Sequence, residues 1–323
     1  MKLEDIQEIA VIGAGQIGQA AALEFALGGY EVRLHSRSGQ SLERGIAGIR
    51  NMMDRMIALG LLDKAQADSG LARVACELAL ANAVANAQIV YEAVYEDLDL
   101  KWQLFADIAR QGRPDAILVS GTSTLSLSDI ASATPNPGRV LLANSSNPPY
   151  LVPLVEVMRN ETTDDEAVDT LCAVLSRIGK KPVVIRKDLP GFVANRLQVS
   201  LLREALHLVQ EGVVSARDID MIIRSSIGRR WAVAGIFEVF EISGQDLTLW
   251  ASSYLMPHLS TAKQPQPVLH ELVERGDLGI KTGRGFYDWT PQAAEALQQR
   301  IARALVEIER WDREESRTDA AGS

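Results

Sequence analysis

Two hydrophobic patterns follow one another along the chain. Up to about residue 187, short β-branched runs alternate with stretches in which apolar residues recur every three or four positions. Short apolar runs are typical of strands in a sheet covered on both faces, and the longer period is typical of amphipathic helices. Residues 1–187 are therefore predicted to form a doubly wound α/β domain around a mostly parallel sheet. The expected strands are Glu8–Ile12, Glu31–His35, Arg73–Cys76, Gln88–Val94, Ala116–Ser120, Val140–Ala143 and Pro182–Ile185, and the expected helices are Gln16–Leu27, Leu42–Ala58, Leu98–Arg110 and Asp164–Ile178.

The pattern changes after residue 187, where strand signals nearly vanish. Long amphipathic runs cover Phe192–Gly212, Ala216–Ile227 and Leu247–Leu259, so residues 188–323 are predicted to form an all-helical domain. Thr290 and Pro291 suit the N-cap and first position of a last helix. The polar sequence from about residue 314 favours a disordered tail.

Composition narrows the class of protein. A chain of 323 residues, 47% of them hydrophobic, is long enough for about two domains. Its net charge of -9 and its lack of Lys/Arg blocks argue against nucleic-acid or anionic membrane partners. Without a signal peptide or an apolar run of about 18 residues, a cytoplasmic protein is expected. Cys76 and Cys172 form no paired motif, and four His residues show no metal-binding spacing, so no metal site is predicted.

A glycine-rich motif points to the chemistry. Gly13-Ala14-Gly15-Gln16-Ile17-Gly18 directly follows the first expected strand and opens the first expected helix. The first glycine permits a tight turn, the second lets the backbone approach a pyrophosphate, and the third allows close helix–strand packing. Because free N–H groups at a helix start attract negative charge, the motif predicts a dinucleotide site and hence an oxidoreductase.

The end of the second expected strand bears on which dinucleotide binds. An acidic residue that holds the adenosine ribose is usual here, but the sequence has Ser36-Arg37-Ser38. No carboxylate is present to repel a 2′-phosphate, and Arg37 can pair with one. NADP(H) is therefore favoured and NAD(H) stays open, unless these are ordinary solvated loop residues.

Four further segments carry a family resemblance. They are Ile89 to Asp97 followed by Lys101, Asn147 to Val157, Asp188 to Leu197 and Gly279 to Trp289. Together they resemble the 3-hydroxyacyl-CoA dehydrogenase superfamily. Pro148-Pro149-Tyr150 and Gly228-Arg229-Arg230-Trp231 are more similar to its lambda-crystallin, gulonate 3-dehydrogenase and carnitine 3-dehydrogenase branch.

The resemblance implies a Rossmann domain, a helical domain, and a small polar substrate bound in the cleft between them. It assigns the substrate-oxygen donor to Ser123, the carboxylate that orients the catalytic imidazole to Glu156, and a substrate-orienting amide to Asn195. Glu96 and Lys101 are expected near the nicotinamide side of the cofactor. Apolar faces along 192–208 and 236–255 and the habit of similar proteins predict a homodimer through the helical domain.

One residue departs from the family pattern. Asn144 stands where the family carries its proton-exchanging His, and an amide is not a general base near neutral pH. Three explanations are open: a substitution that disables a dehydrogenase and traps a complex, a natural reductase for a cyclic imine or iminium, or a non-catalytic, crystallin-like nucleotide-binding protein. Asn144 as a packing residue beside a shifted active site is a fourth.

Arg230 and Trp231 complete the expected site. Relatives in the polar-substrate branch have Arg followed by an aromatic residue here, and a guanidinium can hold a substrate carboxylate through two hydrogen bonds. The alternative is an ion pair that closes a helix end. An acyl-CoA substrate also stays open, because its pantetheine arm requires no motif that the sequence would reveal.

Overall fold

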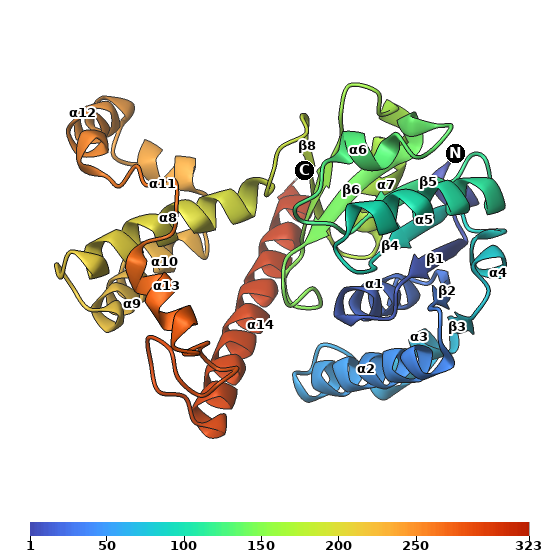
Figure 1. Cartoon of the computed structure of the whole chain (residues 1–323), viewed down its shortest axis with the longest axis horizontal. Helices are drawn as coiled ribbons and strands as arrows, with labels where there is room; N and C mark the ends of the chain where they lie inside the picture. The colour runs from blue at the N-terminus through green and yellow to red at the C-terminus, as the bar shows by residue number, and fades with distance from the viewer. Residues whose placement is uncertain (323) are drawn as a thin grey trace. The chain divides into compact units, whose positions relative to one another are not determined.

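The computed structural model describes residues 1–322, apart from the side chains of residue 313 and residues 315–322. The chain divides into two compact units after Val193, close to the expected domain boundary at residue 187. Unit 1 is residues 1–193 and unit 2 begins at Ala194 (Figure 1).

Unit 1 is built on one eight-stranded sheet in the order β3-β2-β1-β4-β5-β6-β7-β8. All neighbouring strands are parallel except β6 and β7, which are antiparallel. The predicted α/β fold is confirmed, and seven strands match the expected ones to within a few residues. The eighth, β7, was not predicted. The strands are β1 (Glu8–Ile12), β2 (Glu31–His35), β3 (Val74–Glu77), β4 (Ile89–Glu92), β5 (Ile117–Ser120), β6 (Val140–Ser145), β7 (Leu154–Met158) and β8 (Lys181–Ile185).

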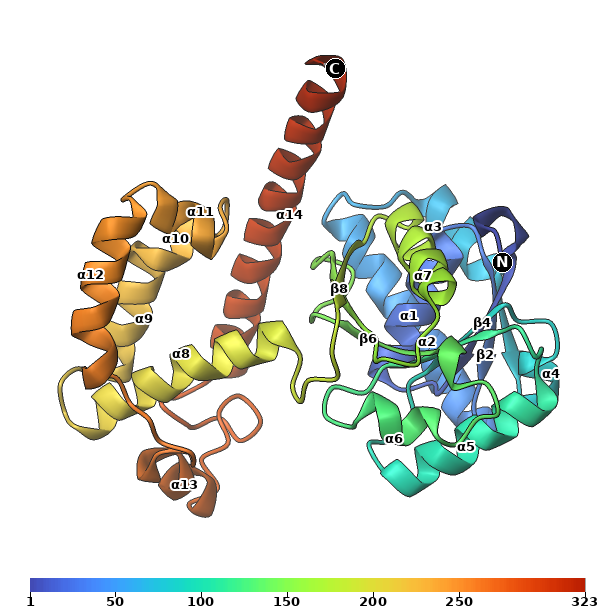
Figure 2. The same ribbon diagram turned by 90° about the horizontal axis from the view of Figure 1, so that it is seen from above.

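Helices cover both faces of this sheet, as the continuous apolar strands require (Figure 2). One face packs against α1, α2, α3 and α7, and the other packs against α4, α5 and α6. Gly179, at φ 81°, ends α7 in the left-handed conformation that glycine tolerates. The helices are α1 (Gln16–Leu27), α2 (Gly39–Ala58), α3 (Lys64–Ala72), α4 (Leu80–Val84), α5 (Leu98–Gln111), α6 (Leu127–Ala131) and α7 (Asp165–Arg177).

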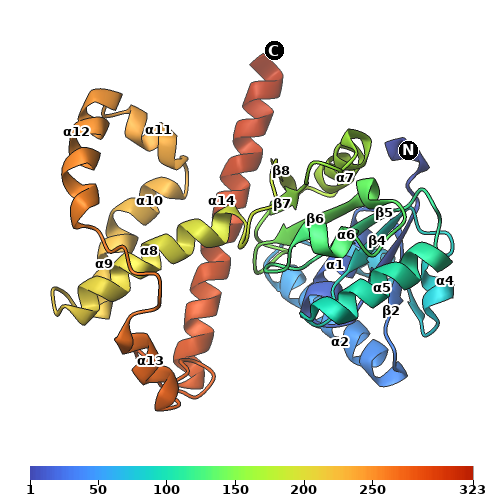
Figure 3. The same cartoon turned by 45° about the horizontal axis from the view of Figure 1, so that its top comes forward.

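Unit 2 consists of helices, and Figure 3 shows α8 as one of its longest. The expected helical runs are present, with the run that starts at Ala216 divided into α9 and α10. The helices are α8 (Val193–Gln210), which begins at the last residue of unit 1, α9 (Ala216–Ser225), α10 (Ile227–Trp231), α11 (Ile236–Glu241), α12 (Gln245–Leu255), α13 (Pro267–Glu274) and α14 (Pro291–Gly322).

The last helix begins as expected and ends later than expected. The Thr290 hydroxyl accepts a hydrogen bond from the Ala293 N–H at 3.1 Å, which makes Thr290 the N-cap. The backbone of α14 is helical to Gly322, where the sequence favours a disordered tail from about residue 314. Glu, Arg and Ala have high helix propensity, so a helix that is already started extends through them at little cost.

Unit 2 leaves large apolar side chains exposed. Phe237 and Ile242 are each more than 80% exposed, and Leu249 and Trp250 are each 69% exposed. Such a concentration exceeds the scattered apolar residues of an ordinary surface. Within residues 1–322, no helix combines the length and apolar composition needed to span a bilayer.

Candidate functional site

The glycine motif lies at the point where the strand order of the sheet reverses, between β1 and β4. A groove of about 430 Å³ opens there, at the carboxyl ends of β1, β2 and β4. This is the place where open α/β sheets bind their ligands. The groove is lined by Ile12, Gly13, Gly15, Gln16, Ile17, His35, Ser36, Arg37, Ala93, Val94, Tyr95, Leu100 and Leu104.

The three glycines fit a dinucleotide for different reasons. Gly13 has φ 115°, and a Cβ there would stand 2.5 Å from the Ala93 carbonyl oxygen. A Cβ at Gly18 would meet the Gly13 carbonyl oxygen at 1.8 Å, so only glycine lets α1 pack against the turn. A Cβ at Gly15 would meet no heavy atom within 4 Å. The turn is therefore fixed by Gly13 and Gly18, and Gly15 leaves open space at the N-terminus of α1 for a pyrophosphate.

The residues after β2 divide into two groups. Ser36 and Arg37 line the groove. The Ser38 hydroxyl instead accepts the Ser41 N–H at 3.2 Å and caps α2, so its acceptor is engaged in the helix. His35 also lines the groove, and the sequence analysis did not select it. Its place as the last residue of a strand at the carboxyl edge was the available signal.

A buried carboxylate lies at the end of β4, next to the groove-lining residues Ala93 and Val94. Glu92, at the end of β4, accepts hydrogen bonds from Lys101 Nζ at 2.6 Å, from the Val94 N–H at 2.6 Å and from the Ser120 hydroxyl at 2.5 Å. Glu92 is fully buried and Lys101 is 1% exposed. Lys101, expected near the nicotinamide, is therefore buried and paired with Glu92, a carboxylate that was not predicted from the sequence.

The loop after β5 carries Ser123 between two threonines that are tied to Glu96. Thr122 and Thr124 both donate hydrogen bonds to Glu96 Oε1, the latter at 2.7 Å, and Lys101 Nζ lies 3.5 Å from Glu96 Oε2. Burial acts to raise the pKa of Glu96, but these hydrogen bonds and the Lys101 charge outweigh it, and the pKa is lowered. An ionised Glu96 thus holds both neighbours of Ser123.

Asn144 and Glu156 face each other across the antiparallel pair of β6 and β7, where they are direct partners in the register. Side chains of such partners lie on the same face of the sheet within about 5 Å at Cβ. Glu156 is 3% exposed, and its Oε1 accepts the Val193 N–H at 2.8 Å. This hydrogen bond lies within unit 1 and ties Glu156 to the last residue of that unit.

A second buried ion pair fixes the segment that follows Asn144. Lys180 Nζ donates to Glu24 of α1 and, at 2.7 Å, to the carbonyl oxygen of Pro149. Burial raises the pKa of Glu24, and the Lys180 charge opposes that shift. The pair joins the first helix, the turn before β8 and the proline segment. The sequence analysis did not select these residues.

The remaining expected residues lie in unit 2. Asn195 is in the first turn of α8, and Arg230 and Trp231 are the last two residues of α10. Arg230 and Trp231 are exposed. Ser123, Asn144 and Glu156 are thus brought to one edge of the sheet in unit 1. Asn195, Arg230 and Trp231 belong to unit 2.

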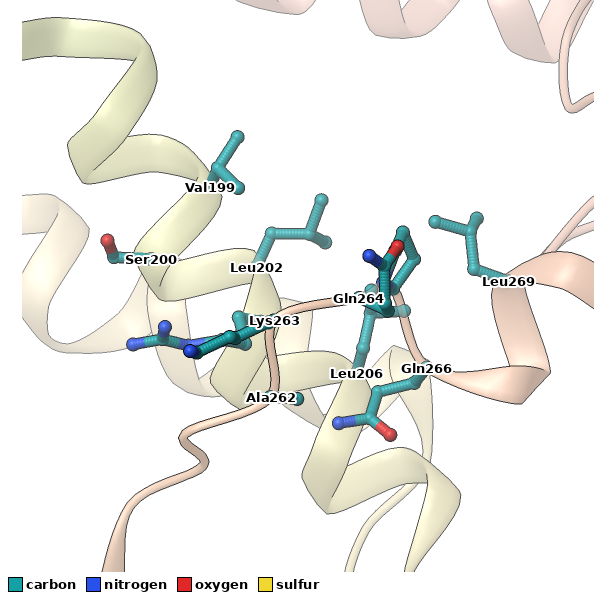
Figure 4. Close-up of a pocket in the computed structure, with 11 residues that line it drawn as sticks. Val199, Ser200, Leu202, Leu206, Ala262, Lys263, Gln264, Gln266 and Leu269 are labelled. Carbon is teal, nitrogen blue, oxygen red and sulfur yellow. The ribbon is translucent and has the colours of Figure 1, made fainter. Parts of the chain in front are cut away.

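Unit 2 also has a pocket of its own, of about 420 Å³, beside α8 (Figure 4). The apolar side chains of Leu202 and Leu206 from α8 and Leu269 from α13 border it, together with the segment at 262–266. None of the site residues predicted from the sequence lines it.

A doubly wound sheet with a glycine turn at its switch point, and a hydroxyl, an amide and a carboxylate at neighbouring strand ends, defines a dinucleotide-dependent oxidoreductase. Residues 8–189 match the family described as 3-hydroxyacyl-CoA dehydrogenase, NAD binding domain, and residues 191–289 match the C-terminal domain of the same family. The chain therefore belongs to the 3-hydroxyacyl-CoA dehydrogenase family of NAD-dependent oxidoreductases.

Individual relatives cover most of the chain. The 5-formyl-3-hydroxy-2-methylpyridine 4-carboxylate 5-dehydrogenase of Mesorhizobium japonicum is 33% identical over 94% of this chain and 98% of its own. A crystal structure of an enzyme of that activity, described as an NAD⁺-dependent dismutase, has a TM-score of 0.86 at the same identity and coverage. L-carnitine dehydrogenase of Streptomyces coelicolor is 35% identical over 75% of this chain and 74% of its own. The lambda-crystallin homolog of Homo sapiens is 32% identical over 76% and 77%.

Proposed function

We propose that this protein transfers hydride between a nicotinamide dinucleotide and a small polar 3-hydroxy or carbonyl compound. The observation that carries the proposal is the open groove at the glycine turn, with Ser123 and Asn144 at the carboxyl ends of the neighbouring strands β5 and β6. Relatives that act on a pyridine carboxylate and on L-carnitine support a short polar substrate. The bound nicotinamide would supply or accept the hydride, and the chain would orient the substrate.

Ser123 is the proposed donor to the substrate oxygen. A neutral hydroxyl stabilises a developing alkoxide without itself titrating. The hydrogen bonds from Thr122 and Thr124 to Glu96 hold the loop on both sides of Ser123, so this donor is positioned before substrate binds. Asn195 would orient the substrate, and Arg230 would bind a carboxylate, with Trp231 beside it.

Asn144 is expected to limit the rate of alcohol oxidation. Because an amide does not take up a proton, alcohol oxidation is expected to lose the roughly 10²–10⁴-fold that a positioned general base contributes. Glu156, its register partner, would then accept a hydrogen bond from the Asn144 amide in place of an imidazole. Reduction of an iminium ion requires no such proton transfer to the reacting atom, so a cyclic-imine reductase is the second candidate.

The variant Asn144→His tests these roles. We expect it to increase NAD(P)⁺-dependent oxidation of L-carnitine or 3-hydroxybutyrate by about 100-fold or more, since it restores a general base beside Glu156. Initial rates of NAD(P)H formation are the measurement, and Asn144→Gln, which keeps the amide, is the matched control.

The same assay separates the alternatives. Unchanged oxidation in Asn144→His would contradict a proton-transfer role for this position. If the unmodified protein turns over a cyclic imine such as 1-pyrroline but neither alcohol, the reductase would be favoured. Saturable cofactor binding with no turnover in any variant would favour the non-catalytic alternative, to which the lambda-crystallin homologs give some weight.

For the cofactor, we propose that the protein prefers NADP(H) although its family binds NAD(H). The support is Ser36 and Arg37 in the groove, with no carboxylate in this part of its lining.

The variant Arg37→Asp tests this preference. It should weaken NADPH binding by about tenfold or more, because a charge-assisted hydrogen bond becomes a repulsion, and should leave NADH affinity within about twofold. Fluorescence titration measures both. Arg110→Asp, an equal charge change in the last turn of α5, is the control, and an unchanged NADPH affinity in Arg37→Asp would contradict the preference.

We also propose that two copies associate through unit 2. The exposed aromatic and aliphatic side chains of α11, α12 and the residue after α11 support this proposal. Exposure of Phe237, Ile242 and Trp250 to water is unfavourable, and a second copy that covers them would remove that cost. A symmetric pair is the commonest arrangement of identical chains.

A further inference from the structure

We propose that His35 makes cofactor selection depend on pH: a protonated His35 favours a dinucleotide with a 2′-phosphate, and a neutral His35 favours one with a free 2′-hydroxyl. The proposal rests on the groove being the cofactor site. His35 would then be a second residue, beside Arg37, that selects the cofactor, and its charge would change with pH.

The position of the imidazole supports this role. His35 is the last residue of β2, lines the groove together with Ser36 and Arg37, and is 7% exposed. Its backbone carbonyl accepts the Gly13 N–H at 2.9 Å, which joins it to the glycine turn. The strand end that carries the imidazole is thus fixed to the turn that would hold the pyrophosphate.

One hydrogen bond sets the tautomer of the ring. His35 Nδ1 lies 3.0 Å from the Glu77 carbonyl oxygen. Since a carbonyl only accepts, Nδ1 must carry a proton in the neutral ring, and Nε2 is then an acceptor. Protonation converts Nε2 into a charged donor. A neutral Nε2 suits the hydroxyl of a ribose, and a protonated Nε2 suits a phosphate.

The surroundings of His35 contain few charges. Glu77 of β3 tends to raise its pKa, but burial has the larger effect and lowers the pKa below its usual 6.5. Arg33, on the same face of β2, is paired with Glu8 and Glu77. Ile12 of β1 and the residues of α4 next to β2 have no titratable side chain, and Arg37 contributes positive charge from the groove.

The sign of the pH effect follows from that pKa. Above pH 7 His35 is neutral, so selection for the 2′-phosphate depends on Arg37. As the pH falls toward 6, the negative charge of a bound 2′-phosphate stabilises the imidazolium and raises the pKa of His35, so binding takes up a proton. Affinity for the phosphorylated cofactor is then enhanced relative to the non-phosphorylated one.

The experiment uses the full-length protein and two stable probes, 2′,5′-ADP and 5′-AMP, which differ only in the 2′-phosphate. Calorimetric titrations at pH 8 and pH 6 give the ratio of the two affinities. The comparison variant is His35→Gln, whose amide can still donate to the Glu77 carbonyl but does not titrate. His270→Gln, at an exposed position of α13, is the matched control.

The 2′-phosphate itself titrates near pH 6, and this effect is common to all variants. The quantity compared is the affinity for 2′,5′-ADP divided by the affinity for 5′-AMP. From pH 8 to pH 6, we expect this ratio to rise about fivefold more in the unmodified protein than in His35→Gln. His270→Gln should behave as the unmodified protein. An equal pH dependence in the unmodified protein and His35→Gln, with 5′-AMP binding intact in both, would overturn the proposal.

Failure of this proposal is distinguishable from failure of the NADP preference. The preference is judged at pH 8, where His35 is neutral, by comparing the unmodified protein with Arg37→Asp. The His35 effect is judged only by the change between pH 8 and pH 6. Loss of 5′-AMP binding in His35→Gln at pH 8 would contradict a purely selective role, because it would show that the side chain supports the groove itself.

Discussion

At the residue scale, the buried pair of Glu92 and Lys101 joins three elements that lie next to the groove. Both side chains are removed from water, and Glu92 also holds the Val94 N–H and the Ser120 hydroxyl. A buried pair is costly to break, since the partner left behind keeps its charge without compensation. The strand ends β4 and β5 and the start of α5 therefore share one support.

Lys101→Met is expected to lower the free energy of unfolding by about 3–5 kcal/mol. The double variant Glu92→Gln/Lys101→Met should lose less, because no isolated charge stays buried. Urea unfolding followed by circular dichroism measures both. Lys64→Met, which breaks the exposed pair with Asp68, is the control and should change stability by less than about 1 kcal/mol. A double variant less stable than Lys101→Met would contradict this account of the pair.

Residues whose role follows from the local sequence could be predicted, and residues whose role depends on tertiary contacts could not. The glycine turn could be predicted because its backbone requirements leave a spacing in the sequence. Glu92 was missed because its partners Lys101 and Ser120 come from other elements. Glu24 and Lys180 were missed for the same reason, since they are far apart in the chain. His35 was not predicted, whereas its neighbours Ser36, Arg37 and Ser38 were.

At the scale of elements, periodicity predicted most of unit 1 and failed at β7. The run Leu154–Met158 has five residues, as many as β1, β2 and β8, but it contains Glu156 and directly follows a proline-rich segment, so its local pattern gave no clear strand signal. It is a strand because it pairs with β6 on one side and β8 on the other, antiparallel with the first and parallel with the second. The pairing with β6 also places Glu156 opposite Asn144, so the missed strand completes the candidate site.

The short helices were harder to predict than the long ones. Helices α4, α6 and α10 have five residues each, too few for a clear amphipathic repeat. Their ends are fixed by contacts, as where the Ser126 side chain caps α6 and donates to Asp188 at 2.8 Å. Local sequence shows such a cap but not the partner that keeps it in place.

At the scale of the whole molecule, the two-unit division was predictable from the change in pattern near residue 187. The exposed apolar surface of unit 2 was also indicated by the sequence, although its cause lies in the packing of α11 and α12. Single substitutions on that surface should therefore act on association rather than on folding.

The proposed homodimer can be tested by measuring the molar mass of the protein in solution. Light scattering after size exclusion should give about twice the 35.2 kDa of one chain for the unmodified protein at micromolar concentration. Phe237→Asp/Trp250→Asp should shift the mass toward one chain, because a charge in an apolar interface is poorly solvated. Leu78→Asp, at an exposed position of unit 1, is the control. A single-chain mass for the unmodified protein would contradict the proposal.

The most direct test of the whole account is the binding of a reduced dinucleotide to the glycine groove. Titration of the unmodified protein with NADPH and NADH should give saturable enhancement of nicotinamide fluorescence that ADP-ribose competes away. Gly15→Leu, whose side chain enters open space, should remain folded by circular dichroism and lose at least about 100-fold in affinity, because the pyrophosphate site is filled. Absence of binding in the unmodified protein, or equal binding by Gly15→Leu, would contradict the central claim.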